Sequence, residues 1–449
     1  MARPTTLRHR LHRAARQLLA HLPRELRFAI FRRLINCDPA PDARLQLGIA
    51  RTQADFEACF TLLHDAYVDS GFMAPEPSGL RVTPYHALPT TTTLYARWDG
   101  EVVGTLSLIR EGVFGFPLQT VFDLTRLRAQ PGQIAEVSAL AIAPRFRKRG
   151  GVVLFPLMKF MYEYCTNFFD TRHLVIAVNP NRIELYESLL FFQRLQAHVV
   201  DSYDFANGAP AVGATLDLTM APEIFRAFYG GRSPHKDLHR YFTGTQMPNI
   251  QFPDRTYFTT NDPVMSPALL DHFFNQRTRV FAQLDERKRQ LLHAIYTEPA
   301  YRDVLPALAS PRRPIGLRRH RRHSMKCPAQ LELHHSAGGM PVPIEVVDVS
   351  LHGFLARTRD HLYEGDRGHA HVALGAGCHA QVDVEVVRFV AAEGGPYYGF
   401  HLAAPDEAWR RCIADLEGRE APHPISRALA APEPVPATDW CGLEQPQPA

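Results

Sequence analysis

The chain has 449 residues, of which 45% are hydrophobic and 21% charged, and its formal net charge is +4. This composition excludes a disordered or collagen-like chain, and the length suffices for two or three domains that each bury a core. No apolar run is long enough to span a membrane and no secretory signal is recognisable, so we expect a cytoplasmic protein.

The seven cysteines follow no CxxC or CxxH spacing. An odd number of scattered cysteines in a chain of this length predicts reduced thiols, with neither a disulfide framework nor a zinc site.

Residues 1–40 are predicted to form a basic amphipathic arm of two short helices that meet at Pro23. Residues 1–36 contain nine arginines and a single acid, Glu25, and leucines recur at helical spacing. Two interpretations stay open. The arm contacts anionic lipid on the cytoplasmic face of a membrane, or it docks on its own domain and leaves the basic face in water.

Residues 41–220 alternate between strand and helix patterns and predict one mixed α/β domain. The expected strands are 44–50, 93–98, 102–109, 135–142, 173–178 and 214–219, with a hairpin turn at Asp99-Gly100. The expected helices are 54–68, 152–167 and 183–190.

A basic glycine-containing loop joins the strand 135–142 to the helix 152–167. Arg147, Arg149, Gly150 and Gly151 lie directly before the start of that helix. Backbone N–H groups at a helix start, reinforced by arginine, favour binding of a phosphate or pyrophosphate.

The following stretch strengthens this interpretation. A strand ends at Val178, Asn179-Pro180-Asn181 follows, and a helix containing Tyr186 leads to Phe191-Phe192. This arrangement resembles the second half of the GNAT acyltransferase fold. The resemblance implies a gap between two parallel strands, 137–142 and 174–178, in which the pantetheine arm of a thioester cofactor pairs with strand backbone.

Two departures from the GNAT pattern narrow the resemblance to one branch of that fold. Val152 stands where the GNAT loop usually has glycine or alanine, and Phe191-Phe192 replaces the usual Gly-Phe. Together with Glu136 on the strand, they make the domain more similar to the FeeM-like N-acyl amino acid synthases, which are related to autoinducer synthases. That branch implies a long acyl chain, delivered by acyl carrier protein or acyl-CoA, and the amine of an amino acid as acceptor.

The resemblance also implies roles for particular residues. Glu136 is the candidate base and Tyr186 the candidate acid for the departing thiolate. The expected cofactor-binding residues are Ser138, Leu140, Arg147, Arg149, Gly150, Gly151 and Asn179. The alternatives are an arginine-paired structural carboxylate for Glu136, packing in a helix seam for Tyr186, and ordinary core rather than an acyl tunnel for the aromatic-rich helix 155–169.

Residues 221–310 carry helical patterns at 222–229, 267–276 and 277–296, separated by an irregular stretch, 243–263. We expect a helical linker or a lid. Residues 419–449 are rich in proline and alanine and predict a disordered tail.

Residues 311–418 contain two motifs in fixed order. Arg318 and Arg322 lie four residues apart, and Asp348, Ser350 and Gly353 follow at the end of a predicted strand, 344–350. Guanidinium groups at this spacing can bind phosphates and guanine edges, and alternate strand residues share one face.

These motifs resemble Arg-x3-Arg and Asp/Asn-x-Ser-x2-Gly of the PilZ domain, a small β-barrel that binds cyclic di-GMP. The resemblance implies that cyclic di-GMP is a regulatory ligand and that all five residues bind it. His334-His335 is the only metal-like pattern nearby, and without a third ligand it predicts no metal site.

The sequence therefore predicts an α+β protein: a GNAT-like domain, a helical linker and a PilZ-type barrel. The expected function is N-acyl transfer regulated by cyclic di-GMP, with acyl carrier protein as partner, no metal cofactor and no specific nucleic acid. A catalytically inactive adaptor that responds to cyclic di-GMP and an acetyl-CoA-dependent N-acetyltransferase remain alternatives.

Overall fold

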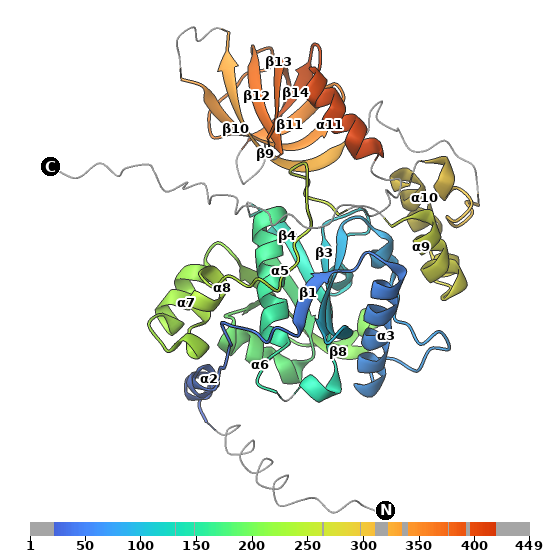
Figure 1. Cartoon of the computed structure of the whole chain (residues 1–449), viewed down its shortest axis with the longest axis vertical. Coiled ribbons are helices and arrows are strands. Elements are labelled where there is room, and N and C mark those ends of the chain that lie inside the picture. The colour runs from blue at the N-terminus through green and yellow to red at the C-terminus, as the bar shows by residue number, and fades with distance from the viewer. Residues whose placement is uncertain are drawn as a thin grey trace, which may run out of the picture.

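The structure is a computed structural model of the chain. It describes residues 22–130, 132–147, 149–262, 265–296, 298–309, 322–334, 340–375, 377–391 and 396–418. An N-terminal α/β domain lies below a C-terminal β-barrel, and a small helical unit packs beside the α/β domain (Figure 1). The predicted order of an α/β domain, helices and a barrel is confirmed.

The N-terminal domain is built on a mixed sheet with the strand order β1-β2-β3-β4-β5-β8-β6, and β7 pairs with β8. The strands are β1 (Leu45–Ile49), β2 (Thr91–Trp98), β3 (Glu101–Arg110), β4 (Gln133–Ile142), β5 (Thr171–Val178), β6 (Gln193–Arg194), β7 (Val200–Tyr203) and β8 (Ala209–Asp217). Among the strands that the structure describes in this sheet, β4 and β5 are the one parallel pair. The β2–β3 hairpin turns at Asp99 and Gly100, both with positive φ, as the Asp-Gly pair predicts.

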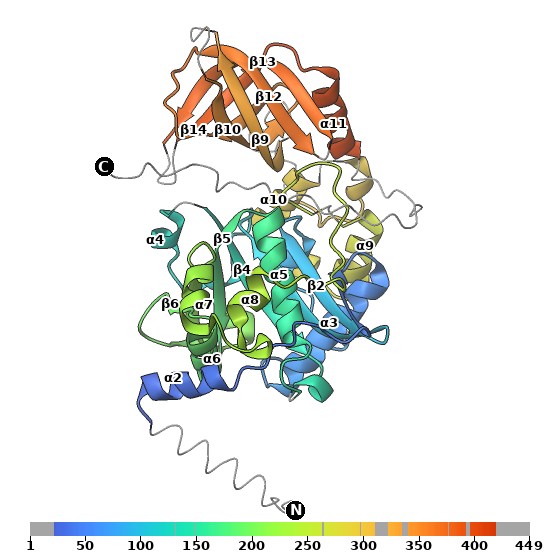
Figure 2. The ribbon, with the colours of Figure 1, turned by 60° about the vertical axis from the view of Figure 1, so that its left-hand side comes forward.

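Helices cover both faces of this sheet (Figures 1 and 2). The helices of the domain are α2 (Arg24–Arg33), α3 (Gln53–Asp69), α4 (Thr125–Arg128), α5 (Leu154–Phe168), α6 (Pro180–Leu189), α7 (Ala221–Tyr229) and α8 (Leu238–Thr243). Phe160 of α5 packs with Leu94, whereas Phe60 of α3 packs with the adjacent Tyr95. Since neighbouring strand residues point to opposite faces, α5 and α3 lie on opposite sides of the sheet.

The described part of the basic arm, α2, docks on its own domain. Arg24 pairs with Glu187 at 2.8 Å and Arg27 with Glu184 at 2.5 Å, and both glutamates belong to α6. The predicted first helix of the arm lies outside the described residues. None of the helices that the structure describes is long and apolar enough to cross a membrane.

Residues 221–250, which the sequence analysis grouped with a linker or lid, are part of the N-terminal domain in the structure. Phe225, Tyr229 and Phe242 belong to the same core as the sheet and α5. Ile250 forms a parallel bridge with Leu47 of β1. Residues 221–250 join the N-terminal domain because α7 and α8 each carry an apolar face that packs on the sheet layer.

The helical unit contains α9 (Pro267–Asp271), a π-helical turn at 272–276, and α10 (Glu286–Ile295). It packs on α3 through Phe273 and Phe274. The prediction of one helix over 277–296 was wrong. Asp285 accepts a hydrogen bond from the backbone N–H of Lys288 and starts α10 there, whereas Phe281 lies in a buried 3-10 turn.

The C-terminal domain is a closed barrel with the strand order β10-β11-β14-β13-β12-β9. Its elements are β9 (His323–Leu333), β10 (Val342–Ser350), β11 (Gly353–Arg357), β12 (Arg367–Gly375), β13 (Cys378–Val390), β14 (Tyr397–Leu402) and α11 (Glu407–Gly418). Trp409 of α11 is fully buried against Phe354, and its indole N–H donates to the carbonyl of Ser350.

Residues 255–262, the linking segment, contact both domains. On one side Arg255 donates to Tyr164 of α5. Within the segment, Arg255 also pairs with Asp262 at 2.8 Å. On the other side Tyr257 enters the barrel core, and the backbone N–H of Thr260 donates to the carbonyl of Ser324 on β9. The linking segment therefore attaches the barrel directly to α5.

Candidate functional site

A cavity of about 1310 Å³ opens where β4 and β5 separate. The parallel pairing of these strands ends at Glu136 and Val175. Ala139 has a positive φ of 54°, and the register of β4 against β3 shifts between Thr105 and Ser107. This bulge turns β4 away from β5 and leaves backbone groups of both strands without a strand partner. The predicted gap between the two strands is therefore present.

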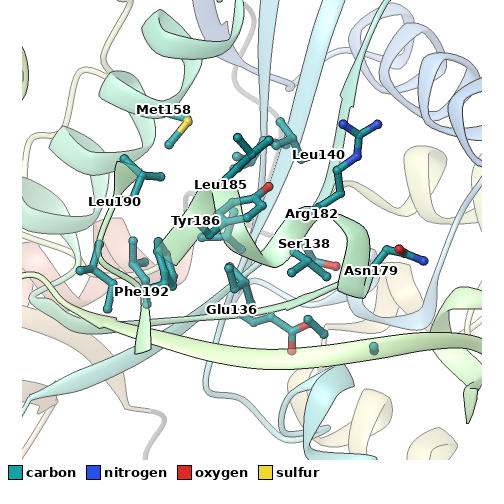
Figure 3. A pocket seen from close by; sticks show the side chains of 18 of the residues that line it. Glu136, Ser138, Leu140, Met158, Asn179, Arg182, Leu185, Tyr186, Leu190 and Phe192 are labelled. Atoms are coloured by element: carbon teal, nitrogen blue, oxygen red, sulfur yellow. The ribbon is translucent and has the colours of Figure 1, made fainter. Parts of the chain in front are cut away.

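The cavity is polar at one end and apolar at the other. Figure 3 shows Asn179 and Arg182 at one end, Met158, Leu190 and Phe192 at the other, and Glu136, Ser138 and Tyr186 between them. Of the predicted residues, Glu136, Ser138, Leu140, Asn179 and Tyr186 line the cavity. The cavity therefore has a polar end, a middle part that contains Glu136 and Tyr186, and an apolar branch.

Glu136 is the acidic side chain at the centre of the cavity. It is 2% exposed, and its carboxylate accepts a hydrogen bond from the backbone N–H of Leu118 at 3.0 Å. Burial raises the pKa of Glu136 from its ordinary 4.5 to about 8, although the Leu118 hydrogen bond opposes the shift. In the described part of the chain this carboxylate pairs with no arginine, which disfavours the purely structural interpretation. A carboxylate with such a pKa can accept a proton from an amine.

Tyr186 lies on α6 and faces the cavity, with its ring edge-on to Phe192 at 5.8 Å. Burial raises the pKa of the Tyr186 phenol, so the group keeps its proton at neutral pH and can donate it. Five residues further along the chain, Phe191 adopts a positive φ of 60°, a conformation that favours glycine. Packing against Phe225 and Phe228 holds Phe191 in this conformation.

The basic glycine loop lies beside the cavity, not in its lining. Gly150 and Gly151 have positive φ, and a Cβ at Gly151 would meet the Phe155 ring at 2.4 Å. Arg147 donates to the carbonyl of Ile142, and Arg149 stacks on Phe146. Because the loop follows β4, it sits at the same sheet edge as Asn179, which follows β5.

Several lining residues were missed by the sequence analysis. Arg182 adds a cation at the polar end, Arg27 and Phe31 come from α2, and Tyr67 and Tyr203 come from α3 and β7. The Tyr203 hydroxyl is buried with no hydrogen-bond partner among the described residues. Arg182 could have been found, since it lies in the first turn after Asn179. The others reach the cavity only through the tertiary fold.

In the barrel, Arg322 and Asp348 lie together. The guanidinium of Arg322 contacts both carboxylate oxygens of Asp348, at 2.8 and 3.0 Å. Arg318 lies outside the described residues. The Ser350 hydroxyl donates to the carbonyl of Gly353 and so closes the turn between β10 and β11.

Gly353 lies at the start of β11, where this strand pairs with β14. A Cβ at this position would lie 2.6 Å from the carbonyl oxygen of Phe400 on β14. The missing side chain lets β11 and β14 approach.

His334, His369 and Asp383 also gather on the barrel, with ligand atoms within 4.8 Å of one another. His369 and Asp383 are thus potential ligands near His334 that could not be recognised from the sequence. His369 and Asp383 form an ion pair at 2.8 Å, and all three residues are exposed. The closest contact in the group is the one between His369 and Asp383, and this pairing explains it without a metal ion.

Comparisons with known proteins found a family match for each of the two domains. Residues 58–217 match the family model of the N-acyl amino acid synthase FeeM, and residues 317–416 match the model of the PilZ domain. A search of curated proteins found no match.

Three solved structures are similar to parts of the chain. FeeM from uncultured soil microbes has a TM-score of 0.34 and 23% identity, covering 40% of this chain and 94% of that chain. The CoA-dependent acyl-homoserine lactone synthase BjaI with MTA has a TM-score of 0.34 and 20% identity, covering 47% and 95%. YcgR from Escherichia coli in complex with c-di-GMP has a TM-score of 0.20 and 23% identity, covering 23% and 46%.

The family models define the class of each part. The N-terminal part is an acyltransferase domain of the FeeM type, and the C-terminal part is a PilZ domain. The predicted fusion of these two domains is confirmed.

The environment of Glu136 predicts a pH-dependent stability. The pKa of Glu136 is higher in the folded than in the unfolded state. Its contribution to the free energy of unfolding is therefore fully present below the unfolded pKa and is lost as the pH rises from about 4.5 to about 8. We expect Glu136→Gln to raise the midpoint of thermal unfolding relative to the wild type more at about pH 9 than at about pH 5. Each pKa unit corresponds to about 1.4 kcal/mol.

The matched control is Glu101→Gln, since Glu101 lies in an exposed ion pair with Arg145. Its difference from the wild type should stay nearly constant over this pH range. A constant difference for Glu136→Gln as well would contradict the raised pKa.

Proposed function

We propose that the chain transfers a long acyl group from the phosphopantetheine arm of acyl carrier protein, or from acyl-CoA, to the amine of an amino acid, and that cyclic di-GMP bound to the PilZ domain changes the rate. The observation that carries the proposal is the cavity at the β4–β5 gap, which places Glu136 between a polar entrance and an apolar branch.

The donor arm would enter along the gap. The unpaired backbone of β4 and β5 can hydrogen-bond the pantetheine amides as an added strand would. Asn179 and Arg182 line the entrance, and Arg147 and Arg149 belong to the loop that follows β4. Cations at this edge suit the phosphate at the head of the arm.

The reaction needs a neutral amine close to the thioester carbon. Glu136 accepts a proton from the amine, the nitrogen forms a bond to the carbonyl carbon, and the C–S bond breaks. Backbone N–H groups at the Ser138–Leu140 bulge stabilise the carbonyl oxygen as charge develops. Tyr186 donates a proton to the departing thiolate. The products are an amide and a free thiol.

The apolar branch favours a long acyl chain over acetyl. Its lining comes from α5, α6, α7 and β8 and includes Met158, Met161, Leu190, Phe192, Leu216 and Leu218. Each methylene buried there contributes about 0.8 kcal/mol, whereas an acetyl group would leave this surface against water. This disfavours the acetyl-CoA alternative.

The transferase proposal predicts a lipid product. Organic extracts of cells that overexpress the chain should contain an N-acyl amino acid, detected by mass spectrometry. Glu136→Gln should remove most of it, and Tyr186→Phe should lower the rate by up to about 10²–10⁴-fold, the range for a general acid.

The matched control is Tyr363→Phe, because Tyr363 is 65% exposed on the barrel. It should leave the product unchanged. Wild-type amounts of product from both Glu136→Gln and Tyr186→Phe would refute the assigned roles.

A contiguous set of contacts supports regulation by the barrel. Arg322 and Asp348 adjoin Ser324 on β9, whose carbonyl accepts from Thr260 of the linking segment. Two residues further along β9, Lys326 pairs with Asp170 at 2.7 Å, and Arg357 of β11 pairs with the same carboxylate at 3.0 Å.

Asp170 occupies the junction between α5 and β5. It has a positive φ of 51° and lies one residue before β5, a strand that lines the cavity. A ligand that moves Arg322 and Asp348 would therefore act on the cavity wall through Asp170 and the linking segment. This is a route through observed contacts, and the coupling is the proposed step.

The PilZ part of the proposal predicts cyclic di-GMP binding through Arg322. Arg322→Ala removes charge-assisted hydrogen bonds worth about 1.5–3 kcal/mol each, so we expect at least about tenfold weaker binding by calorimetry. Arg367→Ala is the matched control, since Arg367 pairs with Glu385 on the exposed barrel surface. Equal affinity in both variants would exclude Arg322 from the site.

The regulatory part predicts that Asp170→Asn separates binding from response. Partly exposed ion pairs contribute up to about 1 kcal/mol each, and Asp170 makes two of them, so the effect of cyclic di-GMP on the rate should fall by up to about thirtyfold. The affinity for cyclic di-GMP should stay within about twofold of wild type. Asp217→Asn, which loses a pair with Arg172 inside the N-terminal domain, is the control. An undiminished response in Asp170→Asn would contradict the route.

A further inference from the structure

The apolar end of the cavity is closed by elements beyond the FeeM match. That match ends at residue 217. Leu218, Ala221 and Phe225, on and just before α7, and Phe242, on α8, all line the cavity. Phe225 and Phe242 are 4% and 5% exposed, so this end is sealed from solvent.

The two phenylalanine rings form one wall. Their centroids lie 5.7 Å apart, and the Phe242 ring also meets Tyr162 of α5 at 5.7 Å. Tyr162 itself lines the cavity. A chain that enters from Glu136 past Met158 therefore ends against aromatic carbon.

Buried polar contacts hold this wall in place. Lys159 of α5 is 1% exposed, and its ammonium donates to the carbonyl of Phe242 at 2.9 Å while pairing with Glu163 at 2.5 Å. At the end of α7, the Tyr229 hydroxyl donates to the carbonyl of Leu189 on α6. Moving the Phe242 backbone would break one hydrogen bond of the buried Lys159 ammonium and leave Glu163 as its partner, and a hydrogen bond to a charged group costs more to lose than one between neutral groups.

A fixed wall discriminates between chains by length. A shorter chain leaves apolar surface unfilled, and a longer one must displace packed side chains at about 1–3 kcal/mol for each added methylene. One methylene in such a pocket corresponds to about 10–200-fold discrimination.

We propose that Phe225 and Phe242 form an end-stop that sets the length of the acyl chain. This inference rests on the proposed transferase function and deepens it, because it assigns the selection of the donor to α7 and α8.

The test compares the chain-length profile of the lipid product among variants of the full chain. Phe242→Ala should lengthen the product, with the ratio of longer to wild-type-length chains rising about tenfold or more. Ala221→Leu fills the same end and should shift the profile to shorter chains. The two opposite shifts cannot arise from a general loss of stability.

The matched control is Met220→Ala at the start of the same helix. Met220 is 46% exposed and does not line the cavity. It should keep the wild-type profile. If Phe242→Ala does not fold, the Ala221→Leu shift decides the question by itself.

The outcomes separate this inference from the function on which it rests. An N-acyl product with the same length profile in Phe242→Ala and Ala221→Leu as in the wild type would overturn the end-stop and leave the transferase intact. Absence of any N-acyl product from the wild-type chain would overturn the transferase itself.

Discussion

The end of the β4–β5 pairing at Glu136 and Val175 is the constraint on which the rest of the structure depends. Two parallel strands in one sheet normally continue to bond, because unpaired backbone groups in a protein interior are costly. Here the bulge at Ala139 turns one strand away and leaves donors and acceptors along a gap. A ligand with amide groups can satisfy them, and the same gap gives that ligand access to the centre of the domain.

The separation of the strands also creates the environment that gives Glu136 its character. A carboxyl group on a fully paired strand would face solvent or a packed layer. At the edge of the gap it is buried beside one backbone N–H group, and burial raises its pKa to about 8. Glu136 therefore keeps its proton at a pH at which an exposed glutamate has lost it.

The walls of the cavity come from distant parts of the chain. α2 contributes the polar side near Glu184, α7 and α8 close the apolar side, and β5 continues back to Asp170 and the barrel. The barrel is thus joined to a wall of the cavity by ion pairs and by the linking segment. A domain attached in this way can influence the site without contributing a residue to it.

Local patterns were sufficient for most of the fold. Alternating and helical spacings located most strands and helices of residues 41–220 to within a few positions but missed α4, β6 and β7, and the Asp99-Gly100 turn was correct. The prediction of one helix over 277–296 failed, because Asp285 caps a new helix within this range and because Phe281 is buried in a core that it shares with α3. Residues 221–250 were placed in a linker for a similar reason, since their apolar faces do not reveal which core they join.

The candidate site, like the fold, was predictable from the sequence only in part. The sequence by itself indicated which chemical groups are present at the gap, Glu136, Ser138, Asn179 and Tyr186, because they match a family pattern on or beside recognisable strands and helices. It also determined the Asp348, Ser350 and Gly353 pattern of the barrel. Only the tertiary structure decided that Tyr203, Phe225 and Phe242 share a cavity with Glu136. Such contacts join residues far apart in the chain, and local spacing carries no information about which faces meet.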